Sequence, residues 1–138
     1  MNAAPRPRAR LVELSRYEAL KLLGSAPLGR VAFTDRALPA IRPVNHVMDG
    51  DTIVIRTHSG SALLKRTLDT EVVAYEADLL DPAARTGWSV VVTGIATRVS
   101  DPADLARYQA MLVPWVDAEM GHVVRIQPDI VSGYRLER

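Results

Sequence analysis

The sequence lacks cysteine altogether, and this absence narrows the chemistry that is open to the chain. Without thiols there is no disulfide, no thiolate nucleophile and no cysteine-based metal site. Structural disulfides are typical of oxidising compartments, so their absence is consistent with a cytoplasmic protein, which is the localisation that we expect.

An excess of charge of one sign is also missing. The 17 lysine and arginine residues are nearly balanced by 16 acidic residues, which gives a formal net charge of +1. Because non-specific nucleic-acid binders usually carry a clear basic excess, we expect no nucleic-acid partner. Lys21 and Lys65 are the only lysines. Lys65 therefore stands out by type, although a solvated surface lysine is the simpler interpretation.

Long apolar runs are absent as well. No run approaches the ~20 residues that a membrane-spanning helix needs, so we expect no membrane partner. The stretch Met1–Arg10 is rich in Pro, Ala and Arg and has no apolar centre, so it is not a secretory signal. We expect residues 1–12 to be a disordered tail and residues 13–138 to form a single domain.

The chain does contain a series of short strands with a few helices. Ser15 and Glu18 form a capping box that begins the first helix, and Gly24 is suited to end it. The expected helices are Ser15–Gly24, Ser61–Leu68 and Asp101–Pro114. The expected strands are Leu28–Thr34, Leu38–Val47, Thr52–Thr57, Val72–Ala77, Trp88–Val99, His122–Ile126 and Ser132–Leu136. This order favours a mainly β fold, an antiparallel barrel with short flanking helices.

Two of these strands carry further information. Pro39 and Pro43 remove backbone donors from Leu38–Val47, so we expect an edge strand or a bulge, where a flat ring could lie. Both faces of Trp88–Val99 are largely apolar, which indicates burial on both sides. In a chain of this size, a second subunit is the expected cover. The segment Asp78–Gly87 before it is expected to be a loop.

The stretch Pro43–Lys65 is the candidate binding site. A strand, a Ser/Gly loop and a helix start follow one another, and the N–H groups at a helix N-terminus favour a phosphate. Ser61 adds a hydroxyl donor, and the guanidinium of Arg56 suits a bidentate anion. Arg56 could equally be an exposed edge residue or the ion-pair partner of Glu71 or Glu76.

Other polar residues are less specific. Asn45 is a candidate amide donor to a cofactor ring, and equally a partner for a backbone group at a bulge near Pro43. His46, His58 and His122 have no spacing typical of metal ligands, so no metal site is expected. No nucleophile elbow occurs, and the pattern assigns no catalytic residue.

Seven segments, in this order and at this spacing, resemble the pyridoxamine 5′-phosphate oxidase-like flavoproteins, above all the branch that includes the nitroimidazole-resistance proteins. They are LGRVAF (Leu28–Phe33), PVNHVMDG (Pro43–Gly50), IRTHSGS (Ile55–Ser61), YEAD (Tyr75–Asp78), WSVVVTGIATRVSDP (Trp88–Pro102), PW (Pro114–Trp115) and IQPDIVSGYRL (Ile126–Leu136). The resemblance implies a six-stranded antiparallel split β-barrel. It also implies a homodimer with FMN at the subunit interface.

The resemblance further implies which residues hold FMN. The phosphate would lie near Arg56, Thr57 and Ser61, and the isoalloxazine ring along β-strand residues 43–45. Trp115 would approach the ring from the other subunit. The full set of implied cofactor contacts is Arg42, Pro43, Val44, Asn45, Arg56, Thr57, Ser61, Leu63, Lys65 and Trp88, with Trp88 also at the dimer interface.

One position departs from the family pattern. Many relatives carry a lysine directly after the hydroxyl residue of the phosphate loop, whereas this chain has Ala62 there. Lys65 follows about one turn later and is the candidate replacement. The departure weakens the phosphate assignment and leaves the fold assignment untouched.

The expected function is that of an FMN-binding oxidoreductase. It would pass electrons from a reduced nicotinamide or deazaflavin donor to a small organic acceptor. A close variant would use the deazaflavin F420 as a diffusible cosubstrate in the same groove. The alternative is a non-catalytic protein that binds flavin or F420 as a carrier or sensor. Ala62 leaves a third possibility, a dimeric scaffold with a decayed site.

Overall fold

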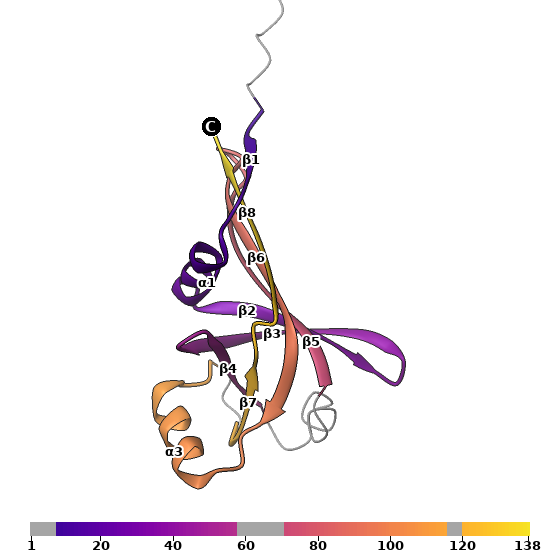
Figure 1. Ribbon diagram of the computed structural model, residues 1–138, viewed down its shortest axis with the longest axis vertical. Helices are drawn as coiled ribbons and strands as arrows, with labels where there is room; N and C mark the ends of the chain where they lie inside the picture. Colours follow the sequence, from indigo (N-terminus) through magenta and orange to yellow (C-terminus); the bar gives the residue numbers. More distant parts are fainter. Residues whose placement is uncertain (1–7, 58–70, 116–119) are drawn as a thin grey trace, which may run out of the picture.

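The computed structural model describes residues 8–57, 71–115 and 120–138, which form a barrel with a sheet that extends beyond it (Figure 1). The strands are β1 (Arg10–Glu13), β2 (Leu28–Asp35), β3 (Leu38–Asp49), β4 (Thr52–Thr57), β5 (Glu71–Asp81), β6 (Thr86–Arg98), β7 (His122–Ile126) and β8 (Ile130–Glu137). The helices are α1 (Arg16–Ser25) and α3 (Pro102–Met111). The expected helix Ser61–Leu68 lies outside the described residues.

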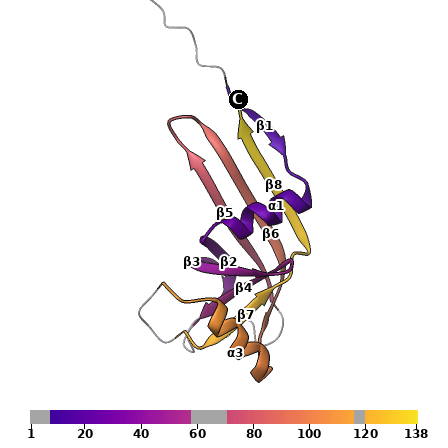
Figure 2. The ribbon, with the colours of Figure 1, turned by 90° about the vertical axis from the view of Figure 1, so that its left-hand side faces the viewer.

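Six antiparallel strands close the barrel. Neighbours pair in the order β6-β5-β2-β3-β4-β7, and β7 pairs back with β6. The 13-residue β6 makes this possible, because its first part pairs with β8 and its last part with β7. Beyond the barrel, β8 lies on β6 and β1 on β8, as Figure 2 shows. The predicted six-stranded antiparallel barrel with flanking helices is confirmed.

Alternate residues of the strands fill the barrel interior. On β6, Trp88, Val90 and Val92 point inward and are buried in the main core. Successive strand residues face opposite sides of a sheet, so their neighbours point outward. Two of these, Val91 and Ile95, are each 37% exposed. Within one chain, the second face of this strand is therefore not buried as expected.

Helix α1 covers the barrel next to β8. The Ser15 hydroxyl oxygen accepts from the Glu18 N–H at 3.2 Å, which confirms the predicted N-cap. The expected stop at Gly24 is wrong, because the helix continues through it to Ser25. Gly24 lies close to β3, since a Cβ there would lie 3.0 Å from Cγ of the Met48 side chain.

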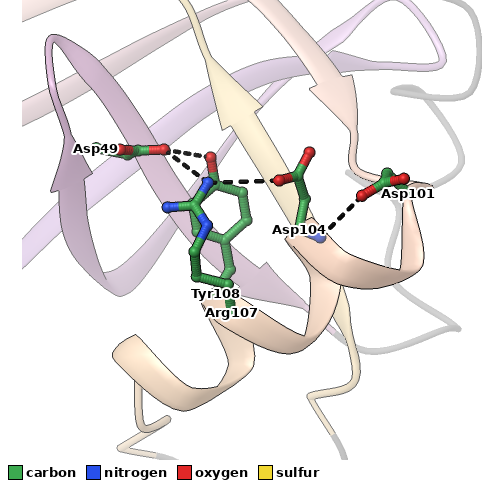
Figure 3. A network of polar contacts seen from close by, with 5 residues as sticks. All are labelled: Asp49, Asp101, Asp104, Arg107 and Tyr108. Atoms are coloured by element: carbon green, nitrogen blue, oxygen red, sulfur yellow. Dashed lines mark hydrogen bonds and ion pairs between the residues drawn. The ribbon is translucent and has the colours of Figure 1, made fainter.

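Helix α3 is fixed to the outside of the barrel by a polar network (Figure 3). Asp101 caps its start by accepting from the Asp104 N–H at 3.0 Å. Asp49, at the end of β3, accepts from the hydroxyl of Tyr108 at 2.5 Å and from Arg107 at 3.2 Å. These two donors, the hydroxyl first, hold the pKa of Asp49 below its usual value.

The prediction of a disordered tail over residues 1–12 is wrong for its last three residues. Residues from Arg10 onward form β1, which pairs with β8 in antiparallel register. Arg10 also donates to the Glu137 carboxylate at 2.8 Å. The strand depends on a partner more than 100 residues away, so local composition could not indicate it. Residues 1–7 lie outside the described part of the chain.

The predicted loop Asp78–Gly87 is also wrong. Strands β5 and β6 continue into it as a hairpin, with Leu79 opposite Trp88, and the turn is confined to residues 82–85. The Asp81 carboxylate accepts from the Ala83 N–H at 3.0 Å and so caps the turn. Cross-strand packing against β6 overrides the weak strand propensity of the aspartates.

Each of the two parts of strand β3 pairs with one neighbouring strand. Leu38–Asn45 pairs with β2, and the remaining four residues pair with β4. Pro39 and Pro43 lie in the first part, which in the described ranges has no strand on its other side. Prolines are tolerated at such an edge, and the predicted edge is confirmed.

Candidate functional site

The expected ring site lies along the one-sided part of β3. Pro43 is exposed and Val44 is half-buried. Backbone groups on the free side of this part can hydrogen-bond a flat heterocycle without breaking a ladder bond. Arg42 is exposed beside them, and its guanidinium donates to the Ile41 carbonyl at 2.9 Å. The structure thus brings these residues together as an accessible strip of backbone.

Asn45 ties a distant segment to this strip. Its amide Nδ2 donates to the carbonyl of Val113 at 2.8 Å, just after α3. The described partner of Asn45 is a backbone group, as the second of the two alternatives for this residue expected. The partner lies far along the chain, however, and not at a bulge near Pro43. Trp115 follows two residues later with 65% of its surface exposed. A contact between Asn45 and a cofactor ring stays a prediction.

Arg56 closes the end of α3. Its Nε donates to the carbonyl of Met120 at 2.6 Å, and its Nη1 to the carbonyls of Leu112 and Gln109 at 2.8 and 3.3 Å. The last turn of α3 carries no basic residue of its own, so Arg56 supplies the missing donors from β4. The exposed-edge and ion-pair alternatives are therefore wrong. A role at a phosphate stays a prediction.

The remaining phosphate residues are only partly described. Thr57 is buried at the end of β4, opposite His122 of β7. Ser61, Leu63 and Lys65 lie outside the described residues. The loop half of the phosphate assignment therefore stays a prediction.

Trp88 belongs to the core of this chain and is 8% exposed. Its indole borders a cavity of about 200 Å³ between the α1–β2 connection and β5. Leu28, Arg30 and Asp78 also line that cavity. The expected places of Trp88 at a cofactor and at a subunit interface stay predictions.

A charged cluster lies on the outward face of the sheet beside this cavity. Arg30 on β2 is 3.2 Å from a carboxylate oxygen of Glu76 and 3.7 Å from one of Asp78, both on β5. Burial, together with the neighbouring Asp78, raises the pKa of Glu76. Glu76 pairs with Val91 across the β5–β6 ladder, so charged and apolar side chains share this face.

A buried polar pair, His46 and Tyr75, was missed by the sequence reasoning. The two imidazole nitrogens of His46 contact the carbonyl of Leu23 and the hydroxyl of Tyr75. Burial lowers the pKa of His46 and raises that of Tyr75. The partners lie 29 residues apart, and no local spacing indicates the contact.

Two further findings concern residues 8–57, 71–115 and 120–138. No helix there is long and apolar enough to cross a membrane. No group of three His, Asp or Glu side chains there is placed to hold a metal ion.

Comparison with known proteins identifies the family. Residues 15–135 match the pyridoxamine 5′-phosphate oxidase family. The uncharacterized protein Rv0080 of Mycobacterium tuberculosis is 53% identical over 139 residues, which cover 98% of this chain and 91% of that protein.

Solved structures agree with the match. The FAD binding protein from Mycobacterium smegmatis is 36% identical with a TM-score of 0.72, over 91% of this chain and 100% of that one. A nitroimidazole resistance protein-like structure from Bacteroides thetaiotaomicron shares the fold at 13% identity with a TM-score of 0.70, over 92% and 89% of the two chains. This chain belongs to the pyridoxamine 5′-phosphate oxidase family, as the resemblance implied.

Proposed function

We propose that this chain binds a flavin nucleotide along β3 and serves as a flavin-dependent oxidoreductase. The observation that carries the proposal is that, among the described residues, Leu38–Asn45 pairs with a strand on one side only. A relative that is 36% identical is an FAD binding protein, which supports a flavin at this fold. Because the flavin supplies the electron chemistry, the protein needs only to bind it, orient it and exclude water.

The charge of Arg56 supports a phosphate at the end of β4. Its described partners are neutral carbonyls, which accept from three of its five N–H groups and bring no negative charge. A half-buried cation raises the local potential and favours an anion nearby. Thr57 is the next residue in the chain, so the field acts where the phosphate is expected.

The proposed site accommodates more than one flavin. FMN is the cofactor that the resemblance implies, whereas the similar protein from Mycobacterium smegmatis is an FAD binding protein, which favours FAD. Both carry the isoalloxazine ring and the first phosphate, so the site proposed for one serves the other. F420 remains the variant cosubstrate in the same groove.

We further propose a homodimer that covers the outward face of the sheet. The register places exposed large apolar side chains from five strands on that one face. They are Leu11, Ile41, Val72, Leu80, Val91, Ile95, Ile130 and Tyr134. Large exposed apolar patches mark interaction surfaces. A second copy would bury the patch and add residues to the cofactor site.

Ligand titration followed by turnover tests the proposal. The apoprotein is titrated with FMN, FAD and F420 while ligand fluorescence is followed, and turnover is then measured with NAD(P)H or reduced F420 and a small organic acceptor. Saturable flavin binding with turnover supports an oxidoreductase. Binding without turnover supports the carrier or sensor alternative. No saturable binding of any of the three contradicts both.

A further inference from the structure

His46 and Tyr75 form a hydrogen-bonded pair inside the barrel. His46 is 5% exposed, and Tyr75 is fully buried. The carbonyl of Leu23 can only accept, so Nε2 of His46, which lies 2.8 Å from it, carries a hydrogen. In the neutral imidazole, Nδ1 then has the lone pair. It therefore accepts from the Tyr75 hydroxyl, whose oxygen is 2.5 Å away.

The Tyr75 hydroxyl has a second acceptor within reach. Its oxygen lies 3.2 Å from the carbonyl oxygen of Val44 on β3. Gly29, which pairs with Val44 across the β2–β3 ladder, makes this approach possible. A Cβ at Gly29 would lie 2.5 Å from the Tyr75 ring. One O–H group therefore faces two acceptors, an imidazole nitrogen and a carbonyl of the proposed flavin strand.

We propose that this pair is a buried proton acceptor whose protonation redirects the Tyr75 hydroxyl. One proton from solvent binds to Nδ1 of His46, and the new N–H donates to the Tyr75 oxygen. The Tyr75 O–H then turns to the Val44 carbonyl. Every polar atom of the pair keeps a partner in both states, which avoids the cost of an unsatisfied buried group. His46 and Tyr75 are thus positioning residues for β3 at Val44.

The neighbouring elements set how readily His46 takes the proton. Helix α1 presents the Leu23 carbonyl in its last turn, where the negative end of the helix dipole favours a cation. β2 and β5 bring Arg30, Glu76 and Asp78, whose opposite charges partly cancel. β4 pairs an apolar residue with His46. Burial opposes the charge and lowers the pKa of His46 from its ordinary value of ~6.5.

NMR of the apoprotein tests the pair without any cofactor. Long-range ¹H–¹⁵N spectra from about pH 4 to about pH 8 report the tautomer and the pKa of each imidazole, a range that brackets the ordinary histidine value. We expect the Nε2–H tautomer of His46 at neutral pH. Tyr75→Phe removes a hydrogen bond from both protonation states of His46, but the charged state loses the stronger one. Proton binding to His46 should therefore weaken by about three-fold or more.

The matched control is Tyr108→Phe, which removes the hydroxyl of the other fully buried tyrosine. It should leave the titration of His46 unchanged. A hydrogen on Nδ1 at neutral pH overturns the proposal, and so does an identical His46 titration in Tyr75→Phe. The tautomer is measured on the unmodified chain, so it decides the matter even if Tyr75→Phe does not fold.

The effect of the pair on flavin binding at β3 rests on the proposed function. A second measurement therefore tests this effect separately from the proton-accepting pair. The FMN dissociation constant of the unmodified chain should change with pH at the pKa of His46. In Tyr75→Phe this inflection should disappear, because the hydroxyl that reaches the Val44 carbonyl is gone. This result supports a ring beside Val44. Identical FMN profiles, with the NMR effect intact, overturn the coupling to the ring and leave the proton-accepting pair in place.

Discussion

The guanidinium of Arg56 on β4 lies 2.8 Å from the carbonyl oxygen of Leu112, at the point where α3 ends. The same group also binds the carbonyls of Gln109 and Met120. An arginine that the sequence pattern assigned to a phosphate therefore joins β4 to the helix on the outside of the barrel. Loss of Arg56 should affect both folding and binding.

Arg56→Ala removes three half-buried hydrogen bonds from a charged donor. Such bonds contribute about 1.5–3 kcal/mol each and do not add fully, so the free energy of unfolding should fall by about 2–4 kcal/mol. Chemical denaturation of the apoprotein measures this change. FMN affinity should fall by about ten-fold or more if the charge of Arg56 also favours the phosphate.

Arg56→Lys separates the two effects. The ammonium group keeps the charge but cannot reach three carbonyls with a rigid fork. The variant should therefore regain FMN affinity more fully than stability. An unfolding free energy that is unchanged in Arg56→Ala would contradict the role of Arg56 at the end of α3.

Gly29→Ala should be strongly destabilising. The added Cβ would lie 2.5 Å from the buried Tyr75 ring, and such overpacking costs about 1–3 kcal/mol. Gly24→Ala is the control, because its Cβ would meet only the flexible Met48 side chain and alanine favours a helix by about 1 kcal/mol. Thermal unfolding of both variants compares them, and equal losses would show that Tyr75 does not pack as described.

Acid should weaken the contact between Asp49 and α3. The hydroxyl of Tyr108 and the guanidinium of Arg107 lower the pKa of Asp49 in the folded chain. In the unfolded chain aspartate titrates near ~3.9, so this contribution is complete above that pH and is lost as the pH falls through the lower, folded pKa. Stability should therefore fall more between about pH 5 and about pH 2 in the unmodified chain than in Asp49→Asn. Parallel urea-denaturation curves for the two proteins would argue against this assignment.

The two faces of β6 should respond differently to substitution. Trp88 is buried in the core of its own chain, so Trp88→Ala should lower the free energy of unfolding by about 3–5 kcal/mol. Ile95 lies on the outward face, and Ile95→Lys should weaken self-association by about ten-fold or more, because a charge is costly in an apolar interface. Analytical ultracentrifugation measures the second effect.

Tyr17→Lys is the control for the interface, since Tyr17 is an exposed residue of α1. It should leave the dimer constant unchanged. If Ile95→Lys assembles as tightly as Tyr17→Lys, the outward face of the sheet is not the subunit interface.

The barrel could be predicted because its signals are local. The β-branched run of β4 and the turn at Gly50 are both visible within a few residues, and the structure has both. The Ser15 cap and the prolines of β3 were interpreted correctly for the same reason. The wrong predictions are those where contacts with distant residues outweigh a local preference, as at Gly24, which lies close to Met48.

The site was harder to predict, because its contacts join residues far apart in the chain. Arg56 finds its carbonyl partners 53 to 64 residues later, and Tyr75 meets His46 across 29 residues. A strand followed by a Ser/Gly loop suggests a phosphate wherever it occurs. The pattern cannot show that the arginine before the loop also closes the end of a helix.

The flavin itself is the most direct test of the central claim. An absorption spectrum of the purified protein, with a mass spectrum of what it releases on denaturation, shows whether a flavin is present and which one. We predict the visible bands of a bound flavin and the mass of FMN or FAD, either as purified or after incubation with the cofactor. A colourless protein that takes up neither FMN nor FAD would contradict the account.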